Sequence, residues 1–160
     1  MTDSLPDLCD KYPSKIRWIP IQWLSFGIKS FFWGEIVTLR CFEDNSRVRQ
    51  LLAQSGKGKV LIVDGHSSLH YALLGDQLAL LAKENGWEGI LILGAIRDVE
   101  TLNTLFIGIK ALGICPLKTD KRDQGEINVV LTLAEIPIYP GDYVYADANG
   151  VIVSREALLF

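Results

Sequence analysis

Three charged residues near the middle of the chain have types and spacing that suit the binding of a small anion. Asp76 directly follows Gly75, and Arg97 and Asp98 are adjacent, 21 and 22 positions further on. One cation and two carboxylates could hold an anionic substrate that is bridged by a divalent metal ion. If Asp76 begins a helix, the free backbone N–H groups of its first turn could hold a carboxylate as well.

The same residues also have purely structural interpretations. Asp76 could complement the dipole of its helix, and Asp98 could be the N-cap of a short helix through Val99 and Leu102. Arg97 could be an ordinary ion-pair partner in a surface loop. The spacing alone leaves these alternatives open.

The elements around these residues predict that they share one edge of a sheet. Uninterrupted apolar runs over Lys59–Val63 and Gly89–Leu93 are typical of strands buried on both faces. A helix over Asp76–Asn85, stopped by Gly86, is expected between them. This order is that of a βαβ unit with neighbouring parallel strands, and such sheets hold ligands at the carboxyl ends of their strands.

The rest of the sequence predicts further helices and strands. A short amphipathic helix is expected over residues 3–11 and an alternating strand over Gly34–Phe42. Asp44-Asn45-Ser46 offers an N-cap for a second helix that Gly56 would close. From Leu105 onward, short apolar strands alternate with turns. The predicted fold class is α/β, a βαβ core with a β-rich C-terminal third, in a single domain over residues 1–160.

Composition limits the class of protein. Hydrophobic residues make up 49% of the 160 positions, enough for one core, and no apolar run approaches the ~20 residues of a spanning helix. The first residues carry acids where a signal peptide needs a basic start. Basic residues are scattered and the net charge is −3. We therefore expect a cytoplasmic protein that binds neither nucleic acid nor a membrane.

Other reactive side chains have weaker patterns. Cys9, Cys41 and Cys115 are too far apart for a zinc site and are expected to be reduced thiols. His66 and His70 would share a helical face, but the glycine and serines around them disfavour a helix, so a packing or hydrogen-bonding role is expected. Strand alternation places Lys110 on a solvated face, which argues against a Schiff-base lysine.

Two further segments are expected to carry no chemistry. The mixed-charge stretch from Lys118 to Asp123 is expected to be a solvated loop, and the aromatic cluster Phe31-Phe32-Trp33 to lie in the core or in a subunit interface. The segment after Val63 lacks the G-x-G-x-x-G pattern, which disfavours nucleotide-dependent methyl or hydride transfer.

Several motifs along the chain resemble those of a known family. They are V-D-G at 63–65, A-L-L-G-D at 72–76, N-G-W-x-G at 85–89, G-x-x-R-D at 94–98 and P-G-D-x-x-x-A-D-x-x-G-V at 140–151. Together they resemble the regulator of ribonuclease E activity A and its relatives, the 4-hydroxy-4-methyl-2-oxoglutarate aldolases. The resemblance runs over essentially the whole chain and implies a fold of the swivelling β/β/α type.

The resemblance implies a role for each residue of the candidate site. The backbone of Gly75, Asp76, Gln77 and Leu78 would bind a small 2-oxo acid, and Arg97 would pair with the substrate's oxygens. Asp98 would ligate Mg²⁺ or Mn²⁺, while Asp76 would hold the ion through ordered water. The family is typically a homotrimer with sites near subunit boundaries. This chain departs from it in having His66-Ser67-Ser68 where glycines are usual and His70 where arginine is common.

The implied function is a metal-dependent aldolase that cleaves 4-hydroxy-4-methyl-2-oxoglutarate, or a similar 4-hydroxy-2-oxo acid, to pyruvate. Cleavage leaves an electron pair on a pyruvate enolate, which Arg97 and the metal would stabilise, while a base near Asp76 takes the C4 hydroxyl proton. Oxaloacetate decarboxylation passes through the same enolate and is expected as a side activity. The alternative is a protein regulator that binds and inhibits a ribonuclease E-type enzyme without chemistry.

Overall fold

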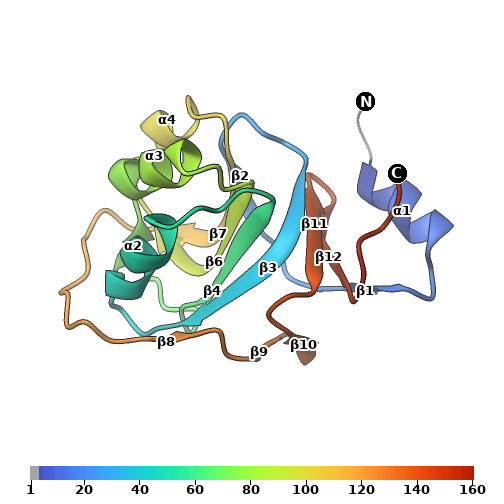
Figure 1. Ribbon diagram of the computed structural model, residues 1–160. Helices are drawn as coiled ribbons and strands as arrows, with labels where there is room; N and C mark the ends of the chain where they lie inside the picture. Colours follow the sequence, from blue (N-terminus) through green and yellow to red (C-terminus); the bar gives the residue numbers. More distant parts are fainter. Residues whose placement is uncertain (1–3) are drawn as a thin grey trace.

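The computed structural model describes residues 4–160 and has a mixed α/β fold, with one large sheet and few helices (Figure 1). Within these residues the helices are Ser4–Lys11 (α1), Ser46–Leu52 (α2), Asp76–Glu84 (α3) and Val99–Leu102 (α4). The first six strands are Ile16–Trp18 (β1), Leu24–Phe26 (β2), Phe32–Arg40 (β3), Lys59–Asp64 (β4), Ala72–Leu74 (β5) and Gly89–Ile96 (β6). The others are Gly108–Ile114 (β7), Glu126–Ile127 (β8), Leu131–Leu133 (β9), Ile136–Ile138 (β10), Tyr143–Asp147 (β11) and Gly150–Ser154 (β12).

The centre of the sheet is parallel and its margins are antiparallel. The strand order is β1-β12-β11-β3-β4-β6-β7-β2, with β5 beside β6 and β8 beside β3. Neighbouring strands from β3 to β7 run parallel, and α2, α3 and α4 lie in the connections between them. The expected βαβ unit is therefore confirmed, and it is repeated once on each side.

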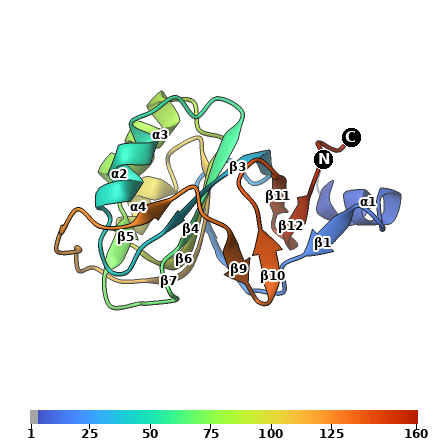
Figure 2. The ribbon, with the colours of Figure 1, turned by 60° about the horizontal axis from the view of Figure 1, so that its bottom comes forward.

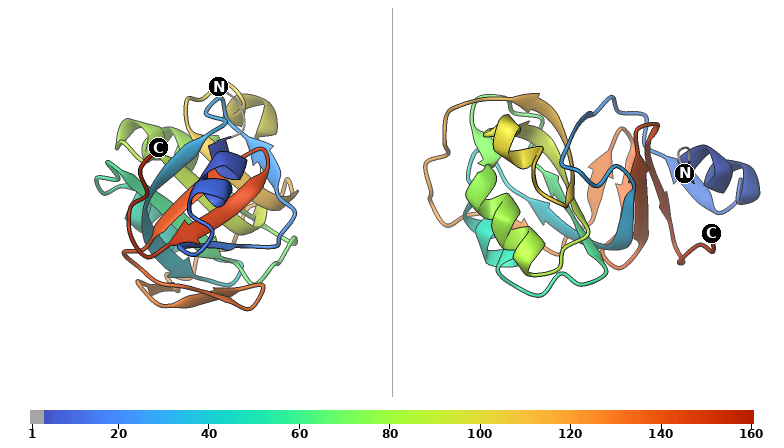
Figure 3. Two further views of the ribbon diagram at one scale, coloured as in Figure 1. Left: turned by 90° about the vertical axis from the view of Figure 1, so that its right-hand side faces the viewer. Right: turned by 90° about the horizontal axis from the view of Figure 1, so that it is seen from above.

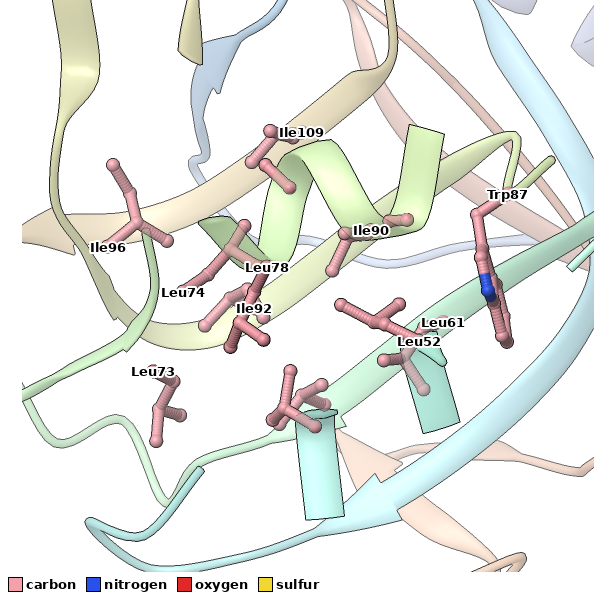
Figure 4. Packing of buried hydrophobic residues seen from close by; sticks show 14 of the residues in the cluster. Leu52, Leu61, Leu73, Leu74, Leu78, Trp87, Ile90, Ile92, Ile96 and Ile109 are labelled. Carbon is pink, nitrogen blue, oxygen red and sulfur yellow. The ribbon is translucent and has the colours of Figure 1, made fainter. Parts of the chain in front are cut away.

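Strands β4 and β6 are buried on both faces, as their apolar runs predict. All eight residues of β6 are buried, and alternate residues of β4 belong to two different hydrophobic clusters. Leu61 contacts the cluster beneath α2 and α3, whereas Ile62 contacts the cluster on the opposite face. Figure 4 shows Leu61 and Ile90 from the sheet beside Leu52 of α2, within the first cluster.

The C-terminal strands cover the face of the sheet that the helices leave open. Val144 of β11 and Val151 of β12 share the second cluster with Ile62 and Leu91 of the central strands. Helix α1 packs against the outer side of β11 and β12, where Leu5 and Tyr145 share a third cluster. Seen along the sheet, the order of layers is helices, central strands, β11 and β12, and finally α1 (Figures 2 and 3).

Several predicted boundaries are confirmed and others are wrong. Helix α1 agrees with the expected N-terminal helix, although Asp3 lies outside the described residues. Strand β6 continues through Gly94 to Ile96, so that Arg97 directly follows its last residue. Strand β5 was not expected, because three residues carry too little pattern to reveal a strand.

The structure contradicts the prediction that Gly56 closes α2. The helix ends at Leu52 with Ala53 as its C-cap, several residues before this glycine. Position 56 requires glycine for a different reason, which is the close packing of the Trp87 ring against its backbone. A Cβ atom on Gly56 would lie 2.1 Å from the Trp87 ring, whose indole N–H donates to the Gln54 carbonyl at 3.0 Å.

Lys110 is buried, which contradicts the expectation that it lies on a solvated face. Lys110 is 3% exposed, and its Nζ donates a hydrogen bond to Ser25 Oγ at 2.7 Å. The strand β2 pairs with β7 through Ser25 and Lys110 and covers this part of the sheet edge. On its own face of the sheet, Lys110 lies beside residues 21–23 and the turn between β11 and β12 at residues 148–150. Alternation along β7 could not reveal that these distant segments cover this face.

The three cysteines are free thiols, as expected. Burial, together with the nearby Asp44 and Asp64 carboxylates, raises the pKa of the Cys41 thiol to about 12. None of the helices within residues 4–160 has the length and apolar character needed to cross a membrane.

The packing of Phe32 generates a stability prediction. Gly89 and Gly108 are paired neighbours on β6 and β7, and a Cβ on either would lie 2.2 or 2.0 Å from the Phe32 ring. Gly89→Ala should therefore lower the free energy of unfolding by ~1–3 kcal/mol. Urea unfolding of Gly89→Ala, Phe32→Leu and the double variant measures the coupling, because the smaller leucine leaves room for the new methyl group. Strict additivity of the two changes would contradict this account.

Candidate functional site

A cavity of about 140 Å³ lies where β5 and β6 end and α3 begins. All the residues that the sequence analysis assigned to the site line it, and they come from two separate segments. The lining residues are Asn45, Arg49, Ala72, Gly75, Asp76, Gln77, Leu78, Arg97, Asp98, Lys118 and Lys121.

The start of α3 provides backbone donors at this cavity. Gly75 is the N-cap with extended backbone angles, and the first intrahelical bond runs from the Ala79 N–H to the Gly75 carbonyl at 3.0 Å. The Asp76 N–H donates to Asp98 Oδ2 at 2.9 Å. Among residues 4–160, the N–H groups of Gln77 and Leu78 have no acceptor, so they are available to an anion.

Asp98 occupies a position that connects the two segments. Its backbone is left-handed (φ 62°), and it precedes α4 without making a side-chain cap to that helix. Its carboxylate instead caps α3 through the Asp76 N–H, while its carbonyl accepts the Leu102 N–H at 2.9 Å. The simple N-cap interpretation is therefore wrong for the side chain, and the exposed Asp98 carboxylate points to the start of α3.

Gly75 leaves the space that Arg97 and Asp98 occupy. A Cβ atom at this position would lie 2.6 Å from Asp98 Oδ2 and 3.4 Å from Arg97 Cγ. The Arg97 N–H donates to the Leu74 carbonyl at 2.9 Å, and Nη1 donates to the Pro116 carbonyl at 3.3 Å. A guanidinium has five N–H donors, so most of those on Arg97 remain for a ligand.

Four polar residues of the lining were not predicted from the sequence. They are Asn45, Arg49, Lys118 and Lys121. The two lysines lie in the stretch that was interpreted as a solvated loop, and they are indeed exposed, but they also face the cavity. Four cationic side chains and two carboxylates give the lining a net formal charge of +2. This balance favours a dianion.

Hydrogen bonds hold the lysine-bearing loop against the site. Asn45 Oδ1 accepts from Thr119 Oγ1 at 2.8 Å. The buried Asp44 carboxylate accepts from the N–H groups of Ser46, Arg122 and Gln124 at 2.9, 2.9 and 3.1 Å. Burial alone would raise the pKa of Asp44, but the hydrogen bonds from Ser46 and from the loop outweigh it and hold that pKa at about 2.

The two histidines lie elsewhere, in a loop that is not helical. The His66 ring packs edge-on against Phe42, with 5.7 Å between ring centroids, and His70 Nδ1 lies 3.1 Å from Glu43 Oε2. Their expected packing and hydrogen-bonding roles are confirmed. No group of three or more histidine, cysteine or acidic side chains within residues 4–160 could hold a metal ion.

A family model described as Aldolase/RraA matches residues 5–153. The chain belongs to this family. A relative from Photobacterium profundum, named "Putative 4-hydroxy-4-methyl-2-oxoglutarate aldolase", is 59% identical over 158 residues, which are 99% of this chain and 97% of the relative. Such names connect this Aldolase/RraA protein with a carbon–carbon lyase activity.

Two solved structures of the same fold carry other names. One, described as an S-adenosylmethionine: 2-dimethylmenaquinone methyltransferase from Geobacillus kaustophilus HTA426, is 42% identical with a TM-score of 0.93, covering 96% of this chain and 95% of that one. The other, the RNA-processing inhibitor RraA from Thermus thermophilis, is 42% identical with a TM-score of 0.92, covering 96% and 93%. The motif-based resemblance is thus confirmed, while the fold is shared by proteins with different names.

The Asp44 network generates a prediction about pH. Because its folded pKa is about 2 and the ordinary value is 3.8, Asp44 contributes up to ~2 kcal/mol of stability, fully present above about pH 4 and lost as the pH falls toward about 2. Asp44→Asn should therefore lower the free energy of unfolding at neutral pH, and the difference from wild type should shrink in acid. Urea unfolding across this pH range measures it.

The matched control for Asp44 is Asp120→Asn, because Asp120 is an exposed carboxylate in the same loop. This change should leave the stability curve nearly unaltered. If both variants lose the same stability at neutral pH, a general charge effect rather than the Asp44 hydrogen bonds would be responsible.

Proposed function

We propose that this Aldolase/RraA protein is a divalent-metal-dependent aldolase that cleaves 4-hydroxy-4-methyl-2-oxoglutarate, or a similar 4-hydroxy-2-oxo acid, to pyruvate. The observation that carries the proposal is the cavity itself. A net positive lining, free helix N-terminal amides and an adjacent Arg97-Asp98 pair suit a small dicarboxylate. Oxaloacetate decarboxylation in the same cavity is part of the proposal, because oxaloacetate is also a small dicarboxylate.

The two ends of the substrate would be bound by different parts of the lining. The N–H groups of Gln77 and Leu78 would hold the C1 carboxylate, and Arg97 would pair with the 2-keto oxygen. Arg49, Lys118 and Lys121 are the remaining cations and would attract the second carboxylate. This division would place the C3–C4 bond between the start of α3 and the lysine-bearing loop.

The reaction breaks the C3–C4 bond and leaves its electron pair on C3. The C4 hydroxyl loses its proton and becomes the keto group of one pyruvate, and C3 later takes up a proton to give the other. Arg97 would stabilise the negative charge that develops on the 2-keto oxygen. Asp76 would accept the hydroxyl proton through an intervening water, since Asp76 is one of the residues that line the cavity.

The donor set fits a hard divalent ion. Asp98 uses Oδ2 to cap α3, and its Oδ1 has no hydrogen-bond partner within the described part of the chain. Mg²⁺ and Mn²⁺ accept one or two carboxylates and keep several waters, so Asp98, with Asp76 acting through water, would be enough to hold the ion. When bound, such an ion supplies a Lewis acid for the keto group.

Two other functions carried by relatives fit this cavity less well. A cavity of about 140 Å³ is smaller than the ~300–1,000 Å³ typical of sites for drug-sized ligands, which disfavours S-adenosylmethionine. Inhibition of an RNA-processing enzyme, the role named for the Thermus relative, remains the second candidate. Inhibition of this kind does not need Asp76, Arg97 and Asp98 to lie close together, whereas the aldolase reaction does.

A pyruvate-release assay tests the proposal. The protein is supplied with a panel of 4-hydroxy-2-oxo acids and oxaloacetate, with Mg²⁺ or Mn²⁺ and with a chelator. Metal-dependent release from a dicarboxylate is expected. Absence of release from every substrate, together with binding to a ribonuclease E-type enzyme, would favour the regulator instead.

For either function we propose that the protein is a cytoplasmic homotrimer. Light scattering would distinguish a trimer from the 17.8 kDa monomer.

The first variant to test is Asp98→Asn. Asparagine tolerates the left-handed backbone, and its oxygen can still accept the Asp76 N–H, so the fold should persist. Loss of the anionic ligand should lower the metal-dependent rate by ~10²–10³. Glu100→Gln, an exposed carboxylate two positions away, is the control and should retain full activity. Unchanged turnover in Asp98→Asn would refute the assignment.

The second experiment compares two reactions in one site. Arg97→Ala should lower aldol cleavage and oxaloacetate decarboxylation alike, by ~10²–10³, because both develop charge on the same oxygen. Asp76→Asn should injure cleavage more than decarboxylation, because only cleavage needs a base for the C4 hydroxyl. The ratio of the two rates at saturating Mg²⁺ controls for misfolding. An unchanged ratio in Asp76→Asn would mean that the base lies elsewhere.

A further inference from the structure

The loop that carries Lys121 is attached to the site through two neighbouring residues. Thr119 is 4% exposed, and its Oγ1 donates to Asn45 Oδ1 at 2.8 Å and accepts from the Asn45 N–H at 3.4 Å. On the other side of Lys121, the Arg122 N–H donates to the Asp44 carboxylate at 2.9 Å. Lys121 therefore lies between two anchored residues, which hold its backbone beside the cavity that it lines.

Asn45 makes these contacts in place of a role that is common for asparagine at its position. It is the N-cap of α2, where an asparagine side chain ordinarily accepts a backbone N–H of the first turn, but it makes no side-chain cap bond. Its Oδ1 accepts from Thr119, and its Nδ2 donates to the Leu73 carbonyl of β5 at 3.4 Å. The Asn45 side chain thereby joins three segments that border the cavity, which are the start of α2, β5 and the loop.

Lys118 is held in a different way. The Ala72 N–H donates to the Leu117 carbonyl at 2.7 Å, and Ala72 forms a parallel bridge with Lys118. This pairing involves backbone groups only, so it does not depend on the Thr119 hydroxyl. Of the two lysines in the lining, Lys121 is therefore the one whose position depends on the hydrogen bonds between Asn45 and Thr119.

We propose that Asn45 and Thr119 are positioning residues that make the cavity selective for 2-oxo acids with a second carboxylate. The inference rests on the proposed function, in which the cations of the lining receive that second carboxylate. The Asn45–Thr119 pair holds the Lys121 ammonium at the cavity before a ligand arrives, so that the ligand does not have to order the loop. A 2-oxo acid with an apolar far end gains nothing from this arrangement.

Two ligands with the same carbon chain test this selectivity. 2-Oxoglutarate and 2-oxopentanoate differ only at C5, which is a carboxylate in the first and a methyl group in the second. Neither has a C4 hydroxyl, so neither can undergo the aldol cleavage, and titration calorimetry with Mg²⁺ present measures binding without turnover. Wild type should bind 2-oxoglutarate more tightly than 2-oxopentanoate.

Thr119→Val keeps the shape of the side chain but removes its hydroxyl. It should weaken the binding of 2-oxoglutarate ~10-fold and leave that of 2-oxopentanoate unchanged. Thr119→Ser retains the hydroxyl and should keep the preference. Asn45→Ala removes the other partner, should have the same effect as Thr119→Val, and replaces it if that variant does not fold. Thr132→Val, at an exposed threonine of β9, is the matched control and should bind both ligands as wild type does.

A double variant tests whether Thr119 acts through Lys121. Lys121→Met should weaken the binding of 2-oxoglutarate by at least as much as Thr119→Val does. Adding Thr119→Val to Lys121→Met should cause no further loss, because the ammonium that the hydroxyl positions is already gone. A Thr119 that only stabilised the fold would instead affect both ligands, and its effect would add to that of Lys121→Met.

Three outcomes would overturn the proposal: a wild type that does not prefer 2-oxoglutarate, folded Thr119→Val and Asn45→Ala variants that keep the preference, or additive effects in the double variant. These binding results are separate from the aldolase reaction. A wild type that prefers 2-oxoglutarate by way of Thr119 but releases no pyruvate from any substrate would contradict the reaction and support the selectivity. Pyruvate release by a protein whose Thr119→Val variant keeps the preference would do the reverse.

Discussion

Strands β4 and β6 have no face toward solvent, and the arrangement of the other elements follows from this constraint. A strand that is apolar on both sides needs a layer on each. Helices α2 and α3 supply one layer and the C-terminal strands β11 and β12 supply the other. The parallel order of the central strands then brings their carboxyl ends to one edge, and the connections after β5 and β6 meet there. Gly75, Asp76, Arg97 and Asp98 of the candidate site come from these two connections.

At that edge a single hydrogen bond fixes the geometry of the site. The Asp98 carboxylate accepts the first free N–H of α3, which joins the end of β6 to the start of a helix that precedes it in the chain. Gly75 permits this contact, since any side chain there would collide with Asp98. The remaining amides of α3 and the Arg97 guanidinium are thereby held on one side of a small cavity. Rigid secondary structure positions these groups more accurately than flexible loops would.

The basic side of the cavity is organised differently. Lys118 and Lys121 lie in a loop whose position depends on Asp44 and Asn45, residues more than 70 positions earlier in the chain. Asp44 is buried and accepts several backbone N–H groups, so the loop is attached at its backbone while its lysines stay in solvent. Lys110 is the opposite case, a buried lysine whose Nζ donates to Ser25 Oγ on the neighbouring strand β2. Burial and not residue type distinguishes the roles of these lysines.

The sequence by itself determined the elements whose pattern is local. The apolar runs of β4 and β6 and the glycine that ends α3 could be interpreted correctly, because helix and strand periods and helix-terminal preferences act over a few residues. The spacing of Asp76, Arg97 and Asp98 by itself left both a binding site and simple structural roles open. The family motifs added the rest of the proposed aldolase site. Only the tertiary structure decided that Asp98 caps α3 and not α4, that Gly56 makes room for Trp87, that Arg49, Lys118 and Lys121 face the cavity, and that Lys110 is buried. Each of these depends on contacts between segments far apart in the chain, and such contacts leave no periodic signal in the residues that make them.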